Sequence, residues 1–94
     1  MNLVGLTDGA VSGTATVSLG MVGRALGGVA ITADGTNNAT VVVRRNSSTG
    51  KVLFHMVTKS PLVAILPVHT DGATQLHYSI SGTGGLAMIY EWVD

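Results

Sequence analysis

Three histidines are the first residues in this chain that could do chemistry, because a neutral imidazole is a common metal ligand and acid–base group. His55 and His77 fall on the less apolar sides of two alternating segments, and His69 adjoins the turn that begins at Thr70. No two of them have the i, i+2 or i, i+4 spacing that would place two ligands on one side of a strand or helix. We therefore expect surface or interface histidines with ordinary hydrogen bonds, and no metal site.

Two turn-like segments could suggest ion or phosphate binding, but each lacks a required part. Asp34 to Asn38 is rich in oxygen, yet it lacks the alternating ligands and final bidentate Glu of a calcium loop, so an Asx-type turn is the simpler interpretation. Ser81 to Gly85 is rich in glycine, but it contains no Lys and no helix is predicted after it. We expect no bound cofactor at either segment.

The usual catalytic constellations are also missing. Serine and threonine are abundant, but no G-x-S-x-G turn presents one of them as a nucleophile. Asp8, Asp34, Asp71 and Asp94 fall at turns or at the terminus, and Glu91 stands alone in a strand-like segment, so paired carboxylates are not expected. The sequence predicts a protein that is not an enzyme.

Charge and hydropathy exclude two classes of partner. Five Lys and Arg balance five Asp and Glu, so the chain lacks the basic footprint that nucleic acid or an anionic membrane requires. The only basic cluster, Arg44, Arg45 and Lys51, flanks a predicted hairpin tip, where we expect it to be solvated or to contact an acidic neighbour. The longest apolar stretch, residues 62–68, is far shorter than a membrane helix, and the first residues lack the features of a signal peptide.

Short strands are the elements that must position these residues. Apolar residues alternate with polar ones in several segments, turn-forming residues separate the segments, and no long stretch has helical spacing. We predict an all-β antiparallel β-sandwich of about seven to eight short strands, Greek-key or jelly-roll-like, with residues 13–94 as one domain and residues 1–12 as an N-terminal arm. The predicted strands are Thr14 to Leu19, Val29 to Ala33, Ala39 to Arg45, Lys51 to Thr58, Leu62 to Val68, Gln75 to Ser81 and Leu86 to Val93.

Two connections are predicted more specifically. Asn46 to Gly50 joins two strands as a hairpin built on a type I turn, with Gly50 in the left-handed conformation. Gly20 to Gly28 is interpreted as a flexible connection, because its four glycines disfavour a helix.

Several predicted strands are apolar on both sides, which is the feature most informative about function. Hydrophobic residues make up 46% of the chain and charged residues 11%, whereas a two-layer sandwich covers only one side of each strand. We interpret the surplus as surface that other chains cover, although central strands shielded by loops are the alternative. The candidate interface residues are Leu53, Val57, Ile89, Trp92 and Val93.

The stretch from Gly27 to Val93 resembles the small β-sandwich accessory virion proteins of tailed bacteriophages, especially capsid decoration or cement proteins. The resemblance lies in the segment from Ile31 to Arg44, the following hairpin, the turns at residues 70–72 and 81–85, and an aromatic last strand. It implies a homo-oligomer, often a trimer, on the outer surface of a virion, where it binds the major capsid protein and stabilises the capsid. Residues 1–12 would then be an arm that orders on binding. The resemblance transfers no functional residue, because this class has no fixed site motif.

Two other functions remain open at the level of sequence. A carbohydrate- or receptor-binding module of a phage tail or fibre would need Tyr78, Tyr90, Trp92 and the histidines exposed together in a groove, although only 4% of the residues are aromatic. A tail or head-to-tail connector component would use apolar sandwich surfaces in the same way as a decoration protein.

Overall fold

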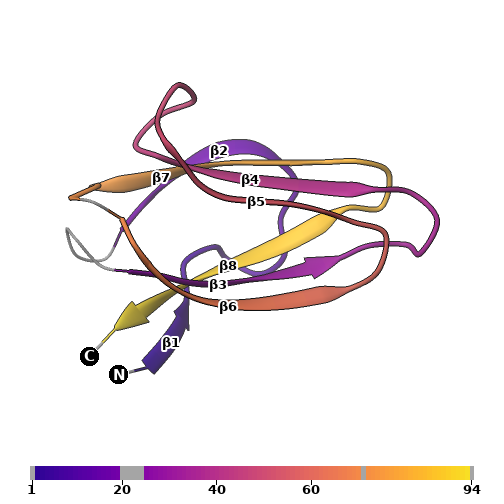
Figure 1. Cartoon of the computed structure of the whole chain (residues 1–94), viewed down its shortest axis with the longest axis horizontal. Coiled ribbons are helices and arrows are strands. Elements are labelled where there is room, and N and C mark those ends of the chain that lie inside the picture. Colours follow the sequence, from indigo (N-terminus) through magenta and orange to yellow (C-terminus); the bar gives the residue numbers. More distant parts are fainter. Residues whose placement is uncertain (1, 20–24, 71, 94) are drawn as a thin grey trace.

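In the computed structural model, residues 2–19, 25–70 and 72–93 are described, and they form eight strands and no helix (Figure 1). The strands are β1 (Asn2–Gly5), β2 (Gly13–Ser18), β3 (Ala25–Thr32), β4 (Ala39–Arg45), β5 (Val52–Thr58), β6 (Leu62–His69), β7 (Gln75–Ser81) and β8 (Leu86–Val93). The all-β prediction is confirmed, and the predicted bounds of β4, β7 and β8 are met residue for residue. A search of the described residues for a helix able to span a membrane finds none.

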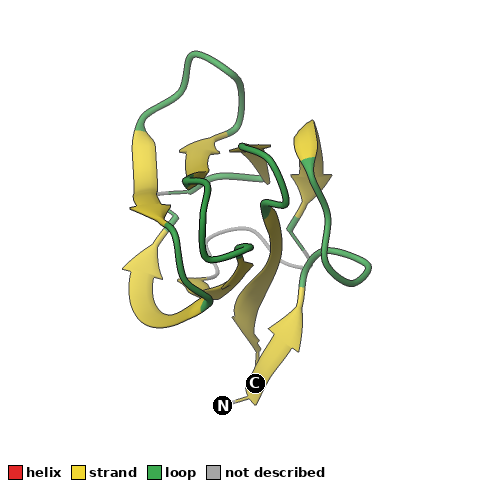
Figure 2. Ribbon diagram, turned by 90° about the vertical axis from the view of Figure 1, so that its right-hand side faces the viewer, coloured by secondary structure: helices red, strands yellow, loops and turns green. Residues whose placement is uncertain are grey.

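The strands form two antiparallel sheets of four, which lie against each other as two layers (Figures 1 and 2). One sheet has the order β1-β8-β3-β6 and the other β2-β7-β4-β5. Except at the β4–β5 hairpin, each strand crosses to the opposite sheet from the one before it. This order is that of an eight-stranded jelly roll, so the structure decides between the two topologies that the sequence left open.

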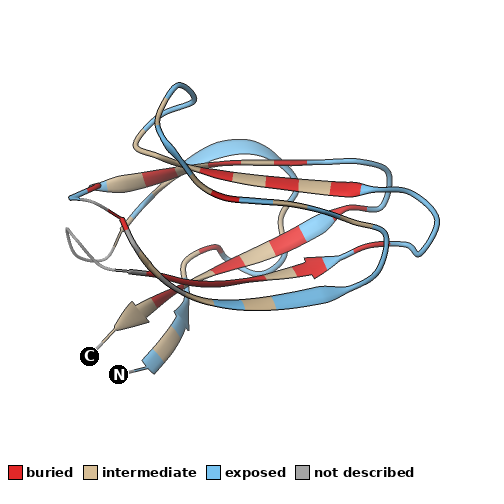
Figure 3. Ribbon diagram, in the orientation of Figure 1, coloured by how far each residue is buried: buried red, intermediate tan, exposed pale blue. Residues whose placement is uncertain are grey.

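The core lies between the two sheets and consists of the alternating inward side chains of their strands (Figure 3). In β7, Leu76, Tyr78 and Ile80 are buried while the residues between them are half-exposed, because successive side chains of a strand point to opposite faces. The buried cluster comprises Leu26, Val29, Ile31, Ala33, Ala39, Val41, Val43, Phe54, Leu76, Tyr78, Ile80, Ala87 and Ile89.

The β4–β5 hairpin forms as predicted, but its left-handed residue is Asn46 and not Gly50. Asn46 has a φ of 64°, in the left-handed region that asparagine tolerates better than most residues. Gly50 is needed for a different reason, since a Cβ there would collide with the carbonyl oxygen of Arg45. The hairpin was thus predicted correctly, but the residue in the left-handed conformation was not.

The N-terminal segment lies within the sandwich and is not a separate arm. β1 pairs with β8, with Asn2 opposite Val93 and Gly5 opposite Tyr90, and Val11 forms a further bridge with Ala87. Between these two contacts, the buried Thr7 hydroxyl donates to the carbonyl of Gly9 at 2.9 Å and accepts the Ile89 N–H at 3.1 Å. The sequence left an eighth strand in the N-terminal segment open but did not locate it, because the partner strand of β1 is at the other end of the chain.

The predicted flexible connection from Gly20 to Gly28 is partly wrong. Residues 20–24 lie outside the described residues, but residues 25–28 belong to β3, which pairs on both sides within its sheet. The register shifts between Leu26 and Gly28 along both neighbours. Toward β8 the extra residue is Gly27, whereas toward β6 the extra residue lies in β6, between Ile65 and Val68. Pairing on both sides therefore outweighs the low strand propensity of two adjacent glycines.

Replacing Thr7 with Val tests how firmly the N-terminal segment is fastened. The substitution keeps the shape but leaves the buried Ile89 N–H without its hydroxyl acceptor, so we expect the free energy of unfolding to fall by about 1–3 kcal/mol. Urea denaturation measures this loss. Thr7→Ser keeps the hydroxyl and should lose less; equal losses in the two variants would contradict the role assigned to the hydrogen bond.

Candidate functional site

The two outer faces of the sandwich have different chemistry, and this difference defines the candidate sites. Residues opposite each other in an antiparallel pair share a face, so the registers assign the outward side chains of each sheet. One outer face is almost entirely apolar, whereas the other is rich in hydroxyl groups and carries basic side chains.

The outer surface of the β1-β8-β3-β6 sheet is called the apolar face. Its outward residues are Leu3, Gly5, Gly28, Ala30, Thr32, Val63, Ile65, Leu86, Met88, Tyr90 and Trp92. None of them is charged. Val63 is 67% exposed, Ile65 is 57% exposed and Leu86 is 38% exposed, which is unusual for large aliphatic residues that lie close together.

The two polar atoms of the aromatic side chains on the apolar face are already engaged within the chain. Trp92 of β8 donates from Nε1 to the carbonyl of Leu66 on β6 at 2.9 Å, although β3 lies between these strands. The indole therefore crosses over β3 near Gly27. Tyr90 donates its hydroxyl to Sδ of Met88 at 3.2 Å. The aromatic part of this face consequently offers a partner mainly hydrocarbon.

Glycines beneath the apolar face allow its side chains to lie flat. A Cβ on Gly27 would collide with Leu3 Cδ1, and one on Gly5 would lie 2.6 Å from Cε of Met88. Leu3 and Met88 thus occupy space that side chains at these glycines would fill. These side chains therefore pack directly over the backbone of β1 and β3.

The outer surface of the β2-β7-β4-β5 sheet is called the hydroxyl face. Its outward residues are Thr14, Thr16, Ser18, Thr40, Val42, Arg44, Val52, His55, Val57, Gln75, His77, Ser79 and Ser81. No carboxylate is among them. The prediction that His55 and His77 lie on the less apolar sides of their strands is confirmed, but no group of three or more His, Asp or Glu within the described chain could hold a metal ion.

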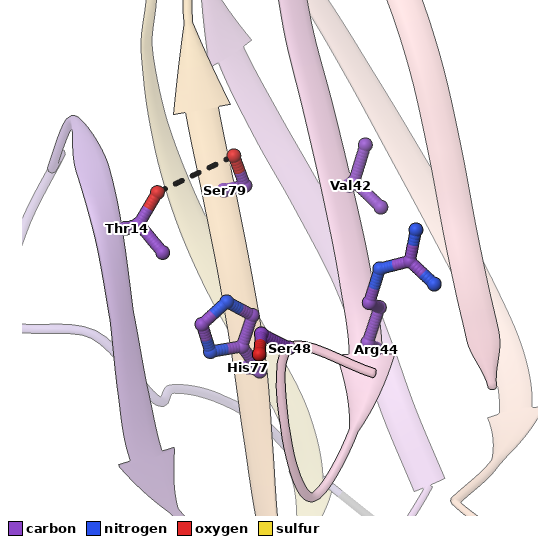
Figure 4. Close-up of a pocket in the computed structure, with 6 residues that line it drawn as sticks. All are labelled: Thr14, Val42, Arg44, Ser48, His77 and Ser79. Carbon is purple, nitrogen blue, oxygen red and sulfur yellow. Dashed lines mark hydrogen bonds between the residues drawn. The ribbon is translucent and has the colours of Figure 1, made fainter. Parts of the chain in front are cut away.

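A hollow of about 280 Å³ lies on the hydroxyl face (Figure 4). It is lined by Thr14 of β2, Val42 and Arg44 of β4, Ser48 of the hairpin, and His77 and Ser79 of β7. Thr14 donates to the hydroxyl of Ser79 at 3.4 Å, and Nδ1 of His77 lies 3.3 Å from Oγ1 of Thr16. Both distances are long for hydrogen bonds, so these polar groups are not tightly held by each other.

The hairpin tip is fastened to the sheet, which fixes the position of Ser48 at the hollow. Asn46 donates its N–H to the carbonyl of Gln75 at 3.0 Å and accepts the Thr74 N–H on its side-chain oxygen at 3.2 Å. Gln75 Nε2 donates to the carbonyl of Asn46 at 2.9 Å. These bonds tie residues 46–50 to the beginning of β7, from which His77 projects.

No family model, curated protein or solved structure matches this chain. The function must therefore be argued from the two faces themselves.

The structure does not bring the five predicted interface residues together. Ile89 is fully buried in the core, so the prediction that it contacts another chain is wrong. Leu53 is half-buried and packs against the core, so it is not part of an exposed apolar surface. Val57 is 48% exposed but lies on the hydroxyl face, and Trp92 lies on the apolar face. Val93, half-buried at the end of β8, follows Trp92 and therefore points to the other side of the sheet.

A local irregularity explains why Leu53 packs against the core and does not point outward. Val43 pairs with Phe54 but Arg44 pairs with Val52, so Leu53 is the extra residue of a β-bulge. The bulge breaks the strict alternation and lets Leu53 and Phe54 both approach the core. The residues that the sequence analysis missed are chiefly Val63 and Ile65, because residues 62–68 of β6 are all apolar and show no alternation that would identify the outer side of the strand.

The oxygen-rich segment after β3 is an Asx-type turn, as predicted. Oδ1 of Asp34 accepts the backbone N–H groups of Thr36 at 2.8 Å and Asn37 at 2.7 Å, and Oδ2 accepts the Asn37 side-chain amide at 2.8 Å. These bonds, chiefly that from the Asn37 backbone, hold the pKa of Asp34 below its ordinary value of 3.8. Both carboxylate oxygens are thus used within the turn.

A matched pair of substitutions on β5 tests the bulge. Leu53→Ala removes a side chain that packs against the core and should lower the free energy of unfolding by about 1–2 kcal/mol. Val57→Ala, on the exposed side of the same strand, should change it by less than about 0.5 kcal/mol. Chemical denaturation measures the free energy of unfolding of both variants. A larger decrease for Val57→Ala than for Leu53→Ala would contradict the assignment of Leu53 to the core side of β5.

The pH dependence of stability tests the Asp34 turn. Because the pKa of Asp34 is lower in the folded state, its contribution is fully present above the ordinary value and is lost as the pH falls through the lowered pKa. Asp34→Asn removes the titrating group. The stability difference between wild type and variant should therefore shrink as the pH is lowered from roughly 6 to 2.5 in urea denaturation. A difference that does not change with pH would argue against the ionised carboxylate as the stabilising form.

Proposed function

We propose that this chain is a structural component of a tailed-bacteriophage virion, which decorates and stabilises the capsid by binding the major capsid protein as a homo-oligomer, with a trimer as the expected state. The observation that carries an assembly role is the uncharged apolar face, on which Val63, Ile65 and Leu86 are exposed. Covering such a surface removes hydrocarbon from water, at roughly 25 cal/mol per Å² of apolar area. The bacteriophage setting rests on the sequence resemblance of residues 27–93.

The composition of the apolar face supports a protein partner over a soluble small molecule. It presents aliphatic residues, a methionine and two aromatic rings, with no charged side chain, and this is the composition of the buried centre of protein interfaces. The jelly-roll topology occurs in both capsid and lectin domains, so the fold alone does not select the function.

A tail or head-to-tail connector component would bury the same apolar face and would differ only in its partner. A carbohydrate- or receptor-binding module built on an aromatic groove has less support. Tyr78 is 9% exposed in the core, while Tyr90 and Trp92 lie on the outside of the opposite sheet, so these rings do not share one groove.

Light scattering coupled to size-exclusion chromatography tests the assembly role. We expect the wild-type chain to form a closed oligomer and Ile65→Asp to weaken its association at least about 100-fold, because the new carboxylate would be buried without a partner. Val57→Asp places the same charge on a valine of the hydroxyl face, which is 48% exposed against 57% for Ile65, and is the matched control.

The same three proteins then test the capsid partner, by co-sedimentation with empty shells of the major capsid protein from the same genome. Wild type and Val57→Asp should sediment with the shells, and Ile65→Asp should bind them more weakly. If the wild-type protein is a monomer at every concentration and does not co-sediment with the shells, the proposed function is overturned. If it is an oligomer that does not co-sediment with the shells, the connector alternative is favoured.

A further inference from the structure

We propose that the hollow on the hydroxyl face is a binding site for a small oxyanion: a carboxylate, sulfate or phosphate group, free or carried on a sugar. This inference does not depend on the proposed virion function, because the hollow and the apolar face are on opposite sheets. The two surfaces can therefore be occupied at the same time.

The hydrogen-bonding groups of the hollow are suited to an anion. Arg44 supplies a permanent positive charge, and His77 lies opposite it on the neighbouring strand. Three hydroxyl groups from three separate elements, those of Thr14, Ser48 and Ser79, complete the polar lining. Guanidinium and hydroxyl donors together form the strong, charge-assisted hydrogen bonds that hold oxyanions in proteins.

Arg44 is held in place without being neutralised by the carboxylates of the described chain. Its NH1 donates to the carbonyl of Gly50 at 3.0 Å, which fixes the half-buried side chain at the foot of the hairpin. A guanidinium has more N–H donors than this bond uses. Within the described chain, the carboxylates are those of Asp8, Asp34 and Glu91, and none of them lines the hollow.

The polar contacts already present can be exchanged for contacts to a ligand at small cost. The Thr14–Ser79 bond, at 3.4 Å, and the Thr16–His77 contact, at 3.3 Å, are long and lie at the surface. Such bonds contribute little to stability, so a hydroxyl can turn toward an anion without a large penalty. Figure 4 shows Thr14 and Ser79 on one side, with Val42 and Arg44 on the other and His77 and Ser48 between them.

Size and charge limit what the hollow can take. A volume of about 280 Å³ lies at the lower end of the range for ligand pockets, which suits one small group and not a buried polymer. One arginine and one histidine, in a chain with balanced charge, are too few for the phosphate contacts of a nucleic-acid duplex. Val42 adds an apolar wall against which the C–H face of a sugar can rest.

Amide chemical shifts in a ¹⁵N-labelled sample test the site directly. Sodium sulfate, sodium phosphate and glucuronate are titrated separately, with glucose as the neutral control for glucuronate. We expect saturating shifts centred on Thr14, Arg44, Ser48, His77 and Ser79, with dissociation constants in the millimolar range (on the order of 1 mM). Tighter binding of glucuronate than of sulfate or phosphate identifies an acidic sugar as the carrier, and the reverse order identifies a free inorganic anion.

Arg44→Gln should weaken anion binding about 10-fold or more, whereas Lys59→Gln, with the same loss of charge at an exposed site outside the hollow, should leave it unchanged. The spectra also show whether each variant is folded. If Arg44→Gln is unfolded, His77→Gln is tested in its place. Shifts that grow linearly without saturation, or equal weakening by the Arg44 and Lys59 substitutions, would overturn the site.

Discussion

The structure depends on one constraint: a two-layer sandwich can bury only the inner face of each sheet. With no cysteine to form a disulfide, stability must come from the packing of side chains such as Val29, Val41, Val43, Leu76 and Ile89 between the sheets. The chain nevertheless carries apolar residues for a third face, the outside of the β1-β8-β3-β6 sheet. That third set adds nothing to the internal core, which is why it points to a role outside the folded monomer.

The parts of the fold that sequence could predict are those with strict alternation between polar and apolar residues. β7 alternates without exception, and its bounds were predicted residue for residue. β1 was left open as a possible eighth strand without bounds, because four residues ending in glycine become a strand only when β8 pairs with them. The beginning of β3 was hidden for a similar reason, since Gly27 and Gly28 have low strand propensity but are held by neighbours on both sides.

The candidate sites were harder to predict than the fold, because a site requires knowing which way each side chain points. A single bulge in β5 brings Leu53 against the core, and residues 62–68 of β6 are all apolar, so no alternation distinguishes the two sides of that strand. The hollow on the hydroxyl face joins residues from β2, β4, the hairpin and β7, which are far apart in the chain. In the sequence, Arg44 was visible only as part of a basic cluster.

The jelly-roll connectivity also bears on how this chain folds. Of the paired strands, only β4 and β5 follow one another in the chain, so most native pairing joins distant segments. Folding rates fall as the average sequence separation of contacts rises, because loop entropy is lost before distant contacts form. Among the described strands, the β4–β5 hairpin is the one local pair, whereas β1 has no partner and β3 lacks one of its two neighbours until β8 has been synthesised. An incomplete chain therefore exposes unpaired strand edges beside hydrocarbon surface, a combination that favours aggregation and makes rapid completion of the fold valuable.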